Sequence, residues 1–377
     1  MNPSKVVWRK GRRMGEEQVL GPHNNCGNRC LMVESTLVNT SGRSESNRPI
    51  GVFASIAAGF DRIAANPLLI LPPLVLDLLL WFGPHVVSPT LFEGYADLLT
   101  VPVGADPAVV DTMIAAVEEF GRRLNVLVAL NSFPVGVPSL MSSRLPLLNP
   151  VGEPLLYVVQ DPGTLLLITI GVGVVGLVLG VLFHRVIASR VAPKAAVSSP
   201  GASIAAIFLL ALIGYLGGIF LATGLLLVAS MLSFIVPVLG ALFVFGGFSA
   251  GVWLIIYCMF TPHGIILYRL NLRQALRESI RTVRLNTMST LLFVVLALGI
   301  SWFGNQVWML PGEDSWYSML GILGHAFVSA MLLAASYVFF QDRRAWSRKV
   351  GTILASQFGA RDNRPEDSAD SDRFEGE

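Results

Sequence analysis

One acidic side chain lies deep within an apolar segment of this sequence. Asp77 is ten residues from the start of the segment at 67–87, which corresponds to ~15 Å along a helix. A carboxyl group near the middle of a bilayer needs a partner, a proton or water, and ionisable residues at that depth are by default candidates for a functional site. We therefore expect Asp77 either to exchange a proton or to bond to a polar neighbour.

The other long apolar segments contain few polar side chains that could meet Asp77. His325 lies in the last of them and is the residue best suited to share a proton with a carboxylate. The predicted intramembrane polar site consists of Asp77, His325, Tyr215, Asn305 and Gln306.

The side-chain sets of common catalytic and metal sites do not occur. An intramembrane aspartyl protease uses two acids, a zinc protease uses HExxH, and a serine enzyme needs a base beside its nucleophile. Zinc takes four ligands, and only His23 stands near Cys26 and Cys30. We predict no catalytic residues, no metal and no cofactor.

Arginines between residues 263 and 286 form a second candidate site. On one helix, Leu272, Leu276 and Val283 fall within about 40° of each other, and the arginines cover an adjacent arc of roughly 120°. Such a helix lies at a membrane interface, where each arginine contributes ~1 kcal/mol on an anionic leaflet. The candidate residues for binding anionic lipid headgroups are Arg269, Arg273, Arg277, Arg281 and Arg284. Their alternative role is to fix the orientation of the chain in the membrane.

Composition places these residues in an all-α integral membrane protein. Hydrophobic residues make up 53% of the chain and charged residues only 14%, whereas about a quarter of the residues of soluble proteins are charged. The mean hydropathy is +0.63. The net charge of +2 does not favour nucleic acid as a partner. The bilayer is the expected partner, together with anionic headgroups or another membrane protein.

The apolar pattern predicts six spans in one domain at 49–350. A short amphipathic helix beginning at Ile50 precedes them along the interface, 88–162 forms an outer helical cap, and 263–286 forms a cytoplasmic amphipathic helix. Residues 1–48 are expected to be a disordered cytoplasmic leader and 351–377 a disordered acidic tail. A seventh span at 124–140 is the alternative reading of part of the cap. The predicted spans are 67–87, 163–189, 204–230, 237–261, 287–310 and 317–341.

Charge predicts the orientation. The cap is acidic, and the loops assigned to the cytoplasm are rich in arginine, so the positive-inside rule places both termini in the cytoplasm. Arginine greatly outnumbers lysine, as in GC-rich bacterial genomes, which indicates a bacterial cytoplasmic (inner) membrane. Glycine pairs four residues apart, at 176 and 180, 214 and 218, and 247 and 251, predict close packing of helices.

Three stretches of the sequence resemble segments of bacterial membrane proteins. ALRESIRTVRLNTMSTLLFVVL (275–296) resembles a segment of bacterial multipass proteins related to the membrane domain of glycerophosphoryl diester phosphodiesterases. NPLLILPPLVLDLLLWFGP (66–84) and FPVGVPSLM (133–141) are similar to recurring segments of uncharacterised bacterial membrane proteins. The resemblance implies a shared six-span helical domain and no activity, since the catalytic barrel of those phosphodiesterases has no counterpart here.

Two functions of different class are compatible with these features. In the first, the protein is a non-enzymatic scaffold or accessory subunit that contacts lipid or membrane protein partners. In the second, it is a small proton-coupled transporter in which Asp77 takes up and releases a proton. The lack of further buried charges and of evident inverted repeats favours the first.

Overall fold

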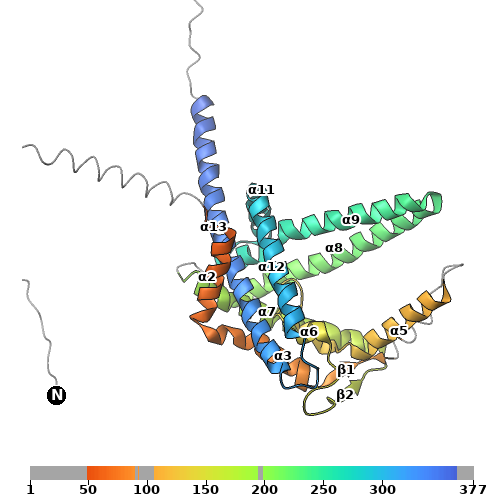
Figure 1. Cartoon of the computed structure of the whole chain (residues 1–377). Helices are drawn as coiled ribbons and strands as arrows, with labels where there is room; N and C mark the ends of the chain where they lie inside the picture. The colour runs from red at the N-terminus through yellow and green to blue at the C-terminus, as the bar shows by residue number, and fades with distance from the viewer. Residues whose placement is uncertain (1–48, 90–91, 93–105, 194–197, 363–377) are drawn as a thin grey trace, which may run out of the picture. The chain divides into compact units, whose positions relative to one another are not determined.

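The computed structural model describes residues 49–89, 92, 106–193 and 198–362, and the predicted leader lies outside these ranges. The predicted all-α fold is confirmed, with two short strands as the exception (Figure 1). The helices in chain order are α2 (Val52–Ala64), the 3-10 helix η1 (Pro67–Ile70), α3 (Leu71–Phe82), α5 (Pro107–Arg123), the 3-10 helix η2 (Val126–Leu130), α6 (Met141–Arg144), α7 (Pro162–Val191), α8 (Pro200–Ile235), α9 (Pro237–Cys258), α10 (Thr261–Tyr268), α11 (Leu272–Leu285), α12 (Thr287–Trp308) and α13 (Ser318–Asp362).

Five stretches of helix in the described ranges are long and apolar enough to cross a membrane, and a bent pair of helices would make a sixth. The five are Pro162–Val191, Pro200–Ile235, Pro237–Tyr268, Thr287–Trp308 and Ser318–Ile353. The bent pair joins α2 to the segment Pro67–Phe82 through an angle of 100°.

The first predicted span is shorter than expected. Helix α3 ends at Phe82, where Gly83 and Pro84 follow, because a residue before proline is driven to extended backbone and Gly83 has ψ 179°. The last residues of that predicted span form strand β1 (His85–Val87), which pairs in parallel with β2 (Leu156–Val158). The short strand explains why the segment at 67–87 does not continue as one helix.

Helix α2 packs along α13 instead of serving only as a separate interfacial helix. At its start, Ile50 N donates to Asp342 Oδ2 at 2.9 Å, and near its middle a Cβ added to Gly59 would lie 2.6 Å from Met331 O. The end of α3 lies beside the residues that precede α13, since the Phe82 and Trp316 ring centroids are 6.0 Å apart. Helix α2 therefore runs antiparallel to α13, and the segment Pro67–Phe82 turns away from that direction by 100°.

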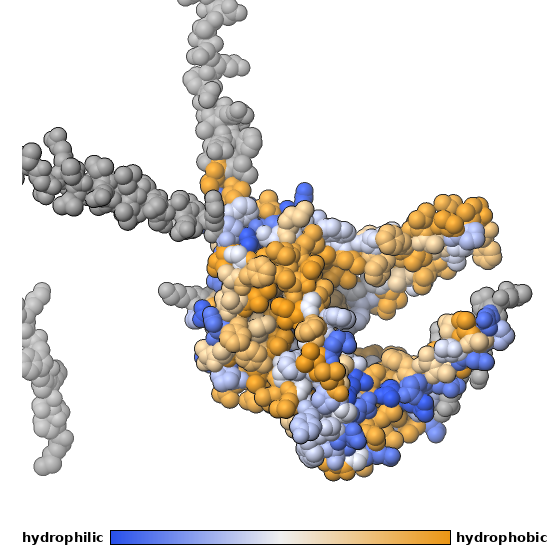
Figure 2. Space-filling model, in the orientation of Figure 1, coloured by the Kyte–Doolittle hydropathy of each residue, from blue (hydrophilic) through white to orange (hydrophobic). Residues whose placement is uncertain are grey.

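Helices α8 and α9 form a hairpin whose surface is almost entirely apolar. They pack against each other, and Pro237 begins α9 directly after the connection at Val236. Figure 2 shows apolar side chains over this hairpin. Phe234, near the tip, is 92% exposed. A surface of this kind needs lipid or another apolar partner.

Two further boundaries differ from the sequence-based expectation. The predicted helix at 263–286 is divided into α10 and α11, because Arg269 takes the left-handed conformation (φ 54°) and Asn271 with Gln274 forms a capping box that starts a new helix. Helix α13 continues to Asp362, past residue 351, where the predicted disordered tail begins. The sequence has no proline between 351 and 364 to end that helix, and residues 363–377 lie outside the described ranges.

The end of η2 and the loop that follows it, both in the region predicted as the outer cap, pack beside the middle of α7. A Cβ on Gly176 would overlap the backbone of Leu130, and one on Gly180 would overlap that of Val135. These glycines lie 14 and 18 residues after Pro162, or about 21 and 27 Å along α7. Leu130 and Val135 thus lie against the middle of an apolar helix, where buried backbone polar groups need partners within the protein.

Candidate functional site

Asp77 is fully buried, and its carboxylate is bonded to the chain segment that packs beside α7. Oδ1 accepts hydrogen bonds from Ser139 Oγ at 2.6 Å and from Met141 N at 2.9 Å. The other oxygen, Oδ2, lies 3.5 Å from His325 Nδ1. Three segments far apart in the sequence therefore meet at one carboxylate.

The hydrogen bonds to Asp77 explain how non-helical backbone is held at this place. Helix α6 begins at Met141, and the first amide groups of a helix have no partner within it. Asp77 accepts from the amide of Met141, and Ser139 Oγ accepts from the amide of Ser142 at 3.0 Å. A side chain of α3 thus caps a helix that lies more than 60 residues later in the chain.

His325 extends this site along α13. Its Nε2 lies 3.2 Å from Ser329 Oγ, so Asp77, His325 and Ser329 stand in the order of an acid, a base and a hydroxyl. Such an order could relay a proton or activate the hydroxyl if a substrate reached it. Two pockets among the described residues are lined by other side chains, and neither includes Ser329.

The remaining predicted members of the polar site lie elsewhere. Tyr215 is half exposed on α8 and makes an edge contact with Phe133, with 6.3 Å between ring centroids. Asn305 is half-buried and Gln306 exposed near the end of α12. Asp77 forms no hydrogen bond or ion pair with these three residues, all of which the structure describes. The structure therefore brings together Asp77 and His325 only.

Ser139 and Ser329 did not emerge from the sequence as site residues. Ser139 belongs to the FPVGVPSLM segment, whose resemblance to recurring membrane-protein segments was the one available signal. No spacing rule links it to Asp77, because the two are 62 residues apart. Ser329 is four residues after His325 and therefore shares its helix face, but serines at that spacing are common in packed membrane helices.

A second buried polar cluster connects α7, α10 and α13. His184 Nδ1 lies 3.2 Å from the hydroxyl of Tyr337, and His263 Nε2 lies 2.8 Å from Ser336 Oγ. The rings of His263 and Tyr337 are 4.3 Å apart between centroids. Within the described ranges no group of three metal-binding side chains could hold an ion. The cluster fixes the packing of three helices by hydrogen bonds and ring contacts.

Near the Ser318 end of α13, a polar network joins the cap to the loop before that helix. Arg123 Nη1 lies 3.1 Å from Glu313 Oε1, the amide of Leu147 donates to Glu313 Oε2 at 3.0 Å, and Trp81 Nε1 donates to Glu313 O at 3.0 Å. Arg123 also bonds Glu119, and this hydrogen bond lowers the pKa of that carboxyl. These contacts hold the cap in place.

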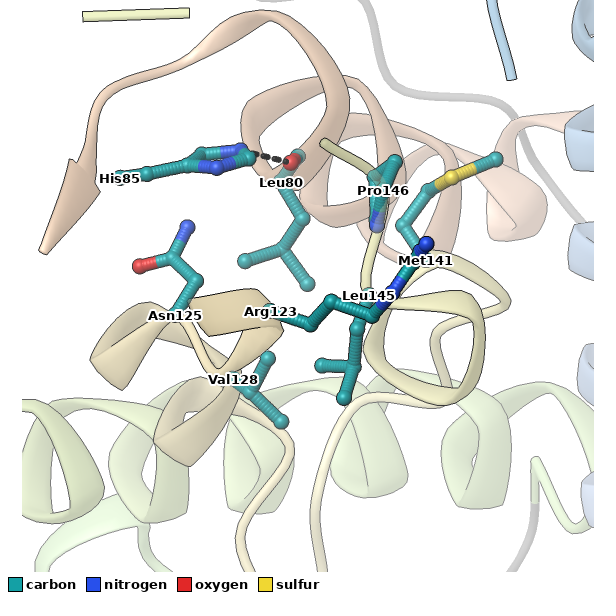
Figure 3. A pocket seen from close by; sticks show the side chains of 8 residues that line it. All are labelled: Leu80, His85, Arg123, Asn125, Val128, Met141, Leu145 and Pro146. Carbon is teal, nitrogen blue, oxygen red and sulfur yellow. Dashed lines mark hydrogen bonds between the residues drawn. The ribbon is translucent and has the colours of Figure 1, made fainter. Parts of the chain in front are cut away.

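The pocket bounded by this network is filled. It is lined by Leu80, His85, Arg123, Asn125, Val128, Met141, Leu145 and Pro146 (Figure 3). The space among these side chains does not admit a water molecule. His85 Nε2 lies 3.3 Å from Leu80 O, and burial lowers the pKa of this imidazole. A filled pocket of this kind joins elements and leaves no room for a ligand.

The five candidate arginines occupy two different settings. Arg269 lies in the break between α10 and α11, and the other four lie on α11 with exposed side chains. Arg277, Arg281 and Arg284 line a groove shared with α13, whereas Arg273 is not among its lining residues. The sequence predicted one arginine-bearing surface, and the structure gathers three of its members around one cavity.

Comparison with protein-family models, with curated proteins and with solved structures finds no match for this chain. The resemblance of 275–296 to the membrane domain associated with glycerophosphoryl diester phosphodiesterases stays a prediction.

Proposed function

We propose that this chain is an integral protein of a bacterial cytoplasmic membrane with both termini in the cytoplasm. We further propose that it is not an enzyme and acts as a scaffold or accessory subunit that contacts lipid or membrane protein partners. The charge-free hairpin of α8 and α9 supports the membrane setting, because its exposed surface is apolar along its length.

The observation that supports a scaffold most directly is the use of Asp77 inside the fold. Its buried carboxylate accepts two hydrogen bonds from the segment that packs beside α7. A carboxylate committed to this role stabilises one arrangement of the chain and is not presented to a substrate. Exposed arginines on α11 remain available to a partner.

The second candidate function is proton-coupled transport, and one feature favours it. Asp77 Oδ2 and His325 Nδ1 are both buried without a hydrogen bond, 3.5 Å apart, and Asp77 belongs to the second helical segment of the bent pair. Broken helices beside ionisable residues are typical of ion and substrate sites in transporters. A small movement that admitted water would allow this pair to exchange a proton.

Asp77→Asn distinguishes the two functions. The variant keeps an acceptor oxygen but weakens two charge-assisted hydrogen bonds, so we expect the free energy of unfolding in detergent to fall by ~1–2 kcal/mol. In proteoliposomes, we expect neither the wild type nor the variant to carry proton flux above that of empty vesicles. Asp111→Asn, an exposed change on α5, is the control for loss of an acid.

Wild-type proton flux that disappears in Asp77→Asn, while thermal stability is unchanged, would contradict the scaffold proposal and support transport. Loss of stability without any flux in the wild type would support the structural role of Asp77.

A further inference from the structure

A groove of about 520 Å³ lies between α11 and the part of α13 at Val350 and Gly351. Its lining combines two kinds of side chain, cationic and apolar. The lining residues are Arg277, Ile280, Arg281, Arg284, Leu285, Val350 and Gly351.

The positive charge of the groove is not neutralised by neighbouring acids in the described part of the chain. Neither Arg277 nor Arg284 forms an ion pair there. The one acid on α11 is Glu278, whose Oε1 lies 2.8 Å from Arg344 Nε and 3.0 Å from Arg348 Nε. Helix α13 thus neutralises Glu278 and leaves the groove arginines available to an anion.

Arg281 is positioned against α13 by the absence of a side chain at Gly351. A Cβ at Gly351 would overlap Arg281 Nη2, and the same nitrogen lies 3.5 Å from Ser347 O. The guanidinium therefore lies close against the helix backbone at this place. The Arg281 guanidinium thus occupies the space that a side chain at position 351 would take.

The apolar side of the groove continues toward the membrane. Leu285 is 43% exposed at the end of α11, and Met288 is 81% exposed in the first turn of α12, a helix long and apolar enough to span. A ligand with a phosphate and an acyl chain would contact arginines at one end and this apolar surface at the other.

We propose that this groove binds the phosphate of an anionic lipid headgroup, with the acyl chain lying over Leu285 and Met288. The inference deepens the proposed scaffold function, on which it rests, by naming the lipid class and the site. Guanidinium groups suit phosphate because they donate several hydrogen bonds in one plane. The exposed apolar surface next to the arginines favours a lipid over a free phosphate, which has no apolar part to bury.

The test compares charge at matched positions of one helix. Purified full-length protein in neutral detergent is titrated with phosphatidic acid or phosphatidylcholine, and bound lipid is counted by native mass spectrometry. We expect phosphatidic acid to bind more tightly than phosphatidylcholine, and Arg284→Gln to weaken its binding about fivefold. Arg273→Gln removes the same charge from α11 outside the groove and should leave the affinity nearly unchanged.

A second variant tests the shape of the groove without changing charge. Gly351→Ala should displace Arg281 and also weaken phosphatidic acid binding severalfold, with melting temperature measured on the same samples to exclude unfolding. Asp77 is intact in all these proteins, so a failure here is distinct from a failure of the scaffold proposal.

Three outcomes would overturn the inference. Equal losses in Arg273→Gln and Arg284→Gln would show general attraction to basic charge. Complete competition by millimolar glycerol 3-phosphate would identify a soluble phosphate as the ligand. Binding that appears only after deletion of residues 363–377 would assign the groove to the acidic tail.

Discussion

At the scale of single residues, the buried acid acts as a cap supplied from a distant helix. A carboxylate in an apolar region is costly unless it is hydrogen-bonded, and free amides at the start of a helix are costly as well. Asp77 and the segment ending at Met141 meet both requirements with the same contacts. The presence of Asp77 in an apolar helix is therefore explained by the backbone amide and the serine hydroxyl of the neighbouring segment, which need an acceptor.

Removal of one donor to this carboxylate should destabilise the protein measurably. Ser139→Ala leaves Asp77 Oδ1 with one hydrogen bond and also removes the acceptor for the amide of Ser142. We expect a loss of ~1.5–3 kcal/mol in the free energy of unfolding, measured by denaturant titration in detergent micelles. Ser143→Ala alters an exposed serine of the same segment and should change stability by less than ~0.5 kcal/mol. Equal effects of the two substitutions would argue against the capping role.

At the scale of elements, the predicted glycine pairs behave in different ways. Gly176 and Gly180 allow backbone to approach α7, as close-packing glycines do, but the approaching backbone is the end of η2 at Leu130 and the loop at Val135 instead of another long helix. Gly247 meets the side chain of Leu225. Gly214 and Gly218 on α8 have no atom within 4 Å of an added Cβ. The spacing of the glycines identifies helix faces that carry small residues, and it does not identify which segment packs against those faces.

Two alanine substitutions on α7 should therefore have opposite effects. Gly180→Ala forces the backbone of Val135 away and should reduce stability by ~1–3 kcal/mol. Gly173→Ala meets open space and should be neutral or stabilise the helix by up to ~1 kcal/mol through its higher helix propensity. Thermal unfolding followed by circular dichroism in micelles measures both. A stable Gly180→Ala variant would contradict the packing described for α7.

At the scale of the whole described domain, α2 runs along α13, and α3 turns by 100° and ends beside the loop that precedes α13. Ile50 contacts Arg343 at one end, and Trp81 contacts Glu313 at the other. This pairing favours counting the bent pair as one broken span. His325, the neighbour of Asp77, lies seven residues after Ser318, or ~10 Å along α13, so the acid lies nearer the Ser318 end than the sequence suggested.

Cysteine labelling tests the resulting topology. In a background with Cys26, Cys30 and Cys258 replaced by alanine, Arg122→Cys should react with an impermeant maleimide in intact spheroplasts. Gly51→Cys and Arg273→Cys should react only after permeabilisation, because the broken span and the three spans α7 to α9 separate them from the cap. Arg122 and Arg273 are exposed, and a Cβ added at Gly51 would have no atom within 4 Å, so a cysteine at each position is accessible to the reagent. Reaction of Gly51→Cys from outside would show that α2 and α3 do not cross.

Composition and local pattern were sufficient to determine the fold class and the positions of most helices. The long apolar run without charge at 204–230 falls within α8, and most of the run at 237–261 forms α9, since only helices satisfy backbone polar groups within one segment in lipid. The N-terminus of α5 could also be predicted from the sequence, because Asp106 followed by Pro107 is a typical start of a helix. In the structure Asp106 accepts a hydrogen bond from the amide of Ala108. The uniqueness of Asp77 and the suitability of His325 as its neighbour came from the sequence as well.

Tertiary structure alone decided which groups surround Asp77 and where the arginines lie relative to α13. The hydrogen bond from Ser139 spans 62 residues, and the groove beside Arg284 requires α13 to pass α11 at Gly351. Neither follows from local periodicity, because periodicity reports which face of a segment is apolar and not which distant segment covers it. The break between α2 and α3 likewise became a broken span only through its packing against α13.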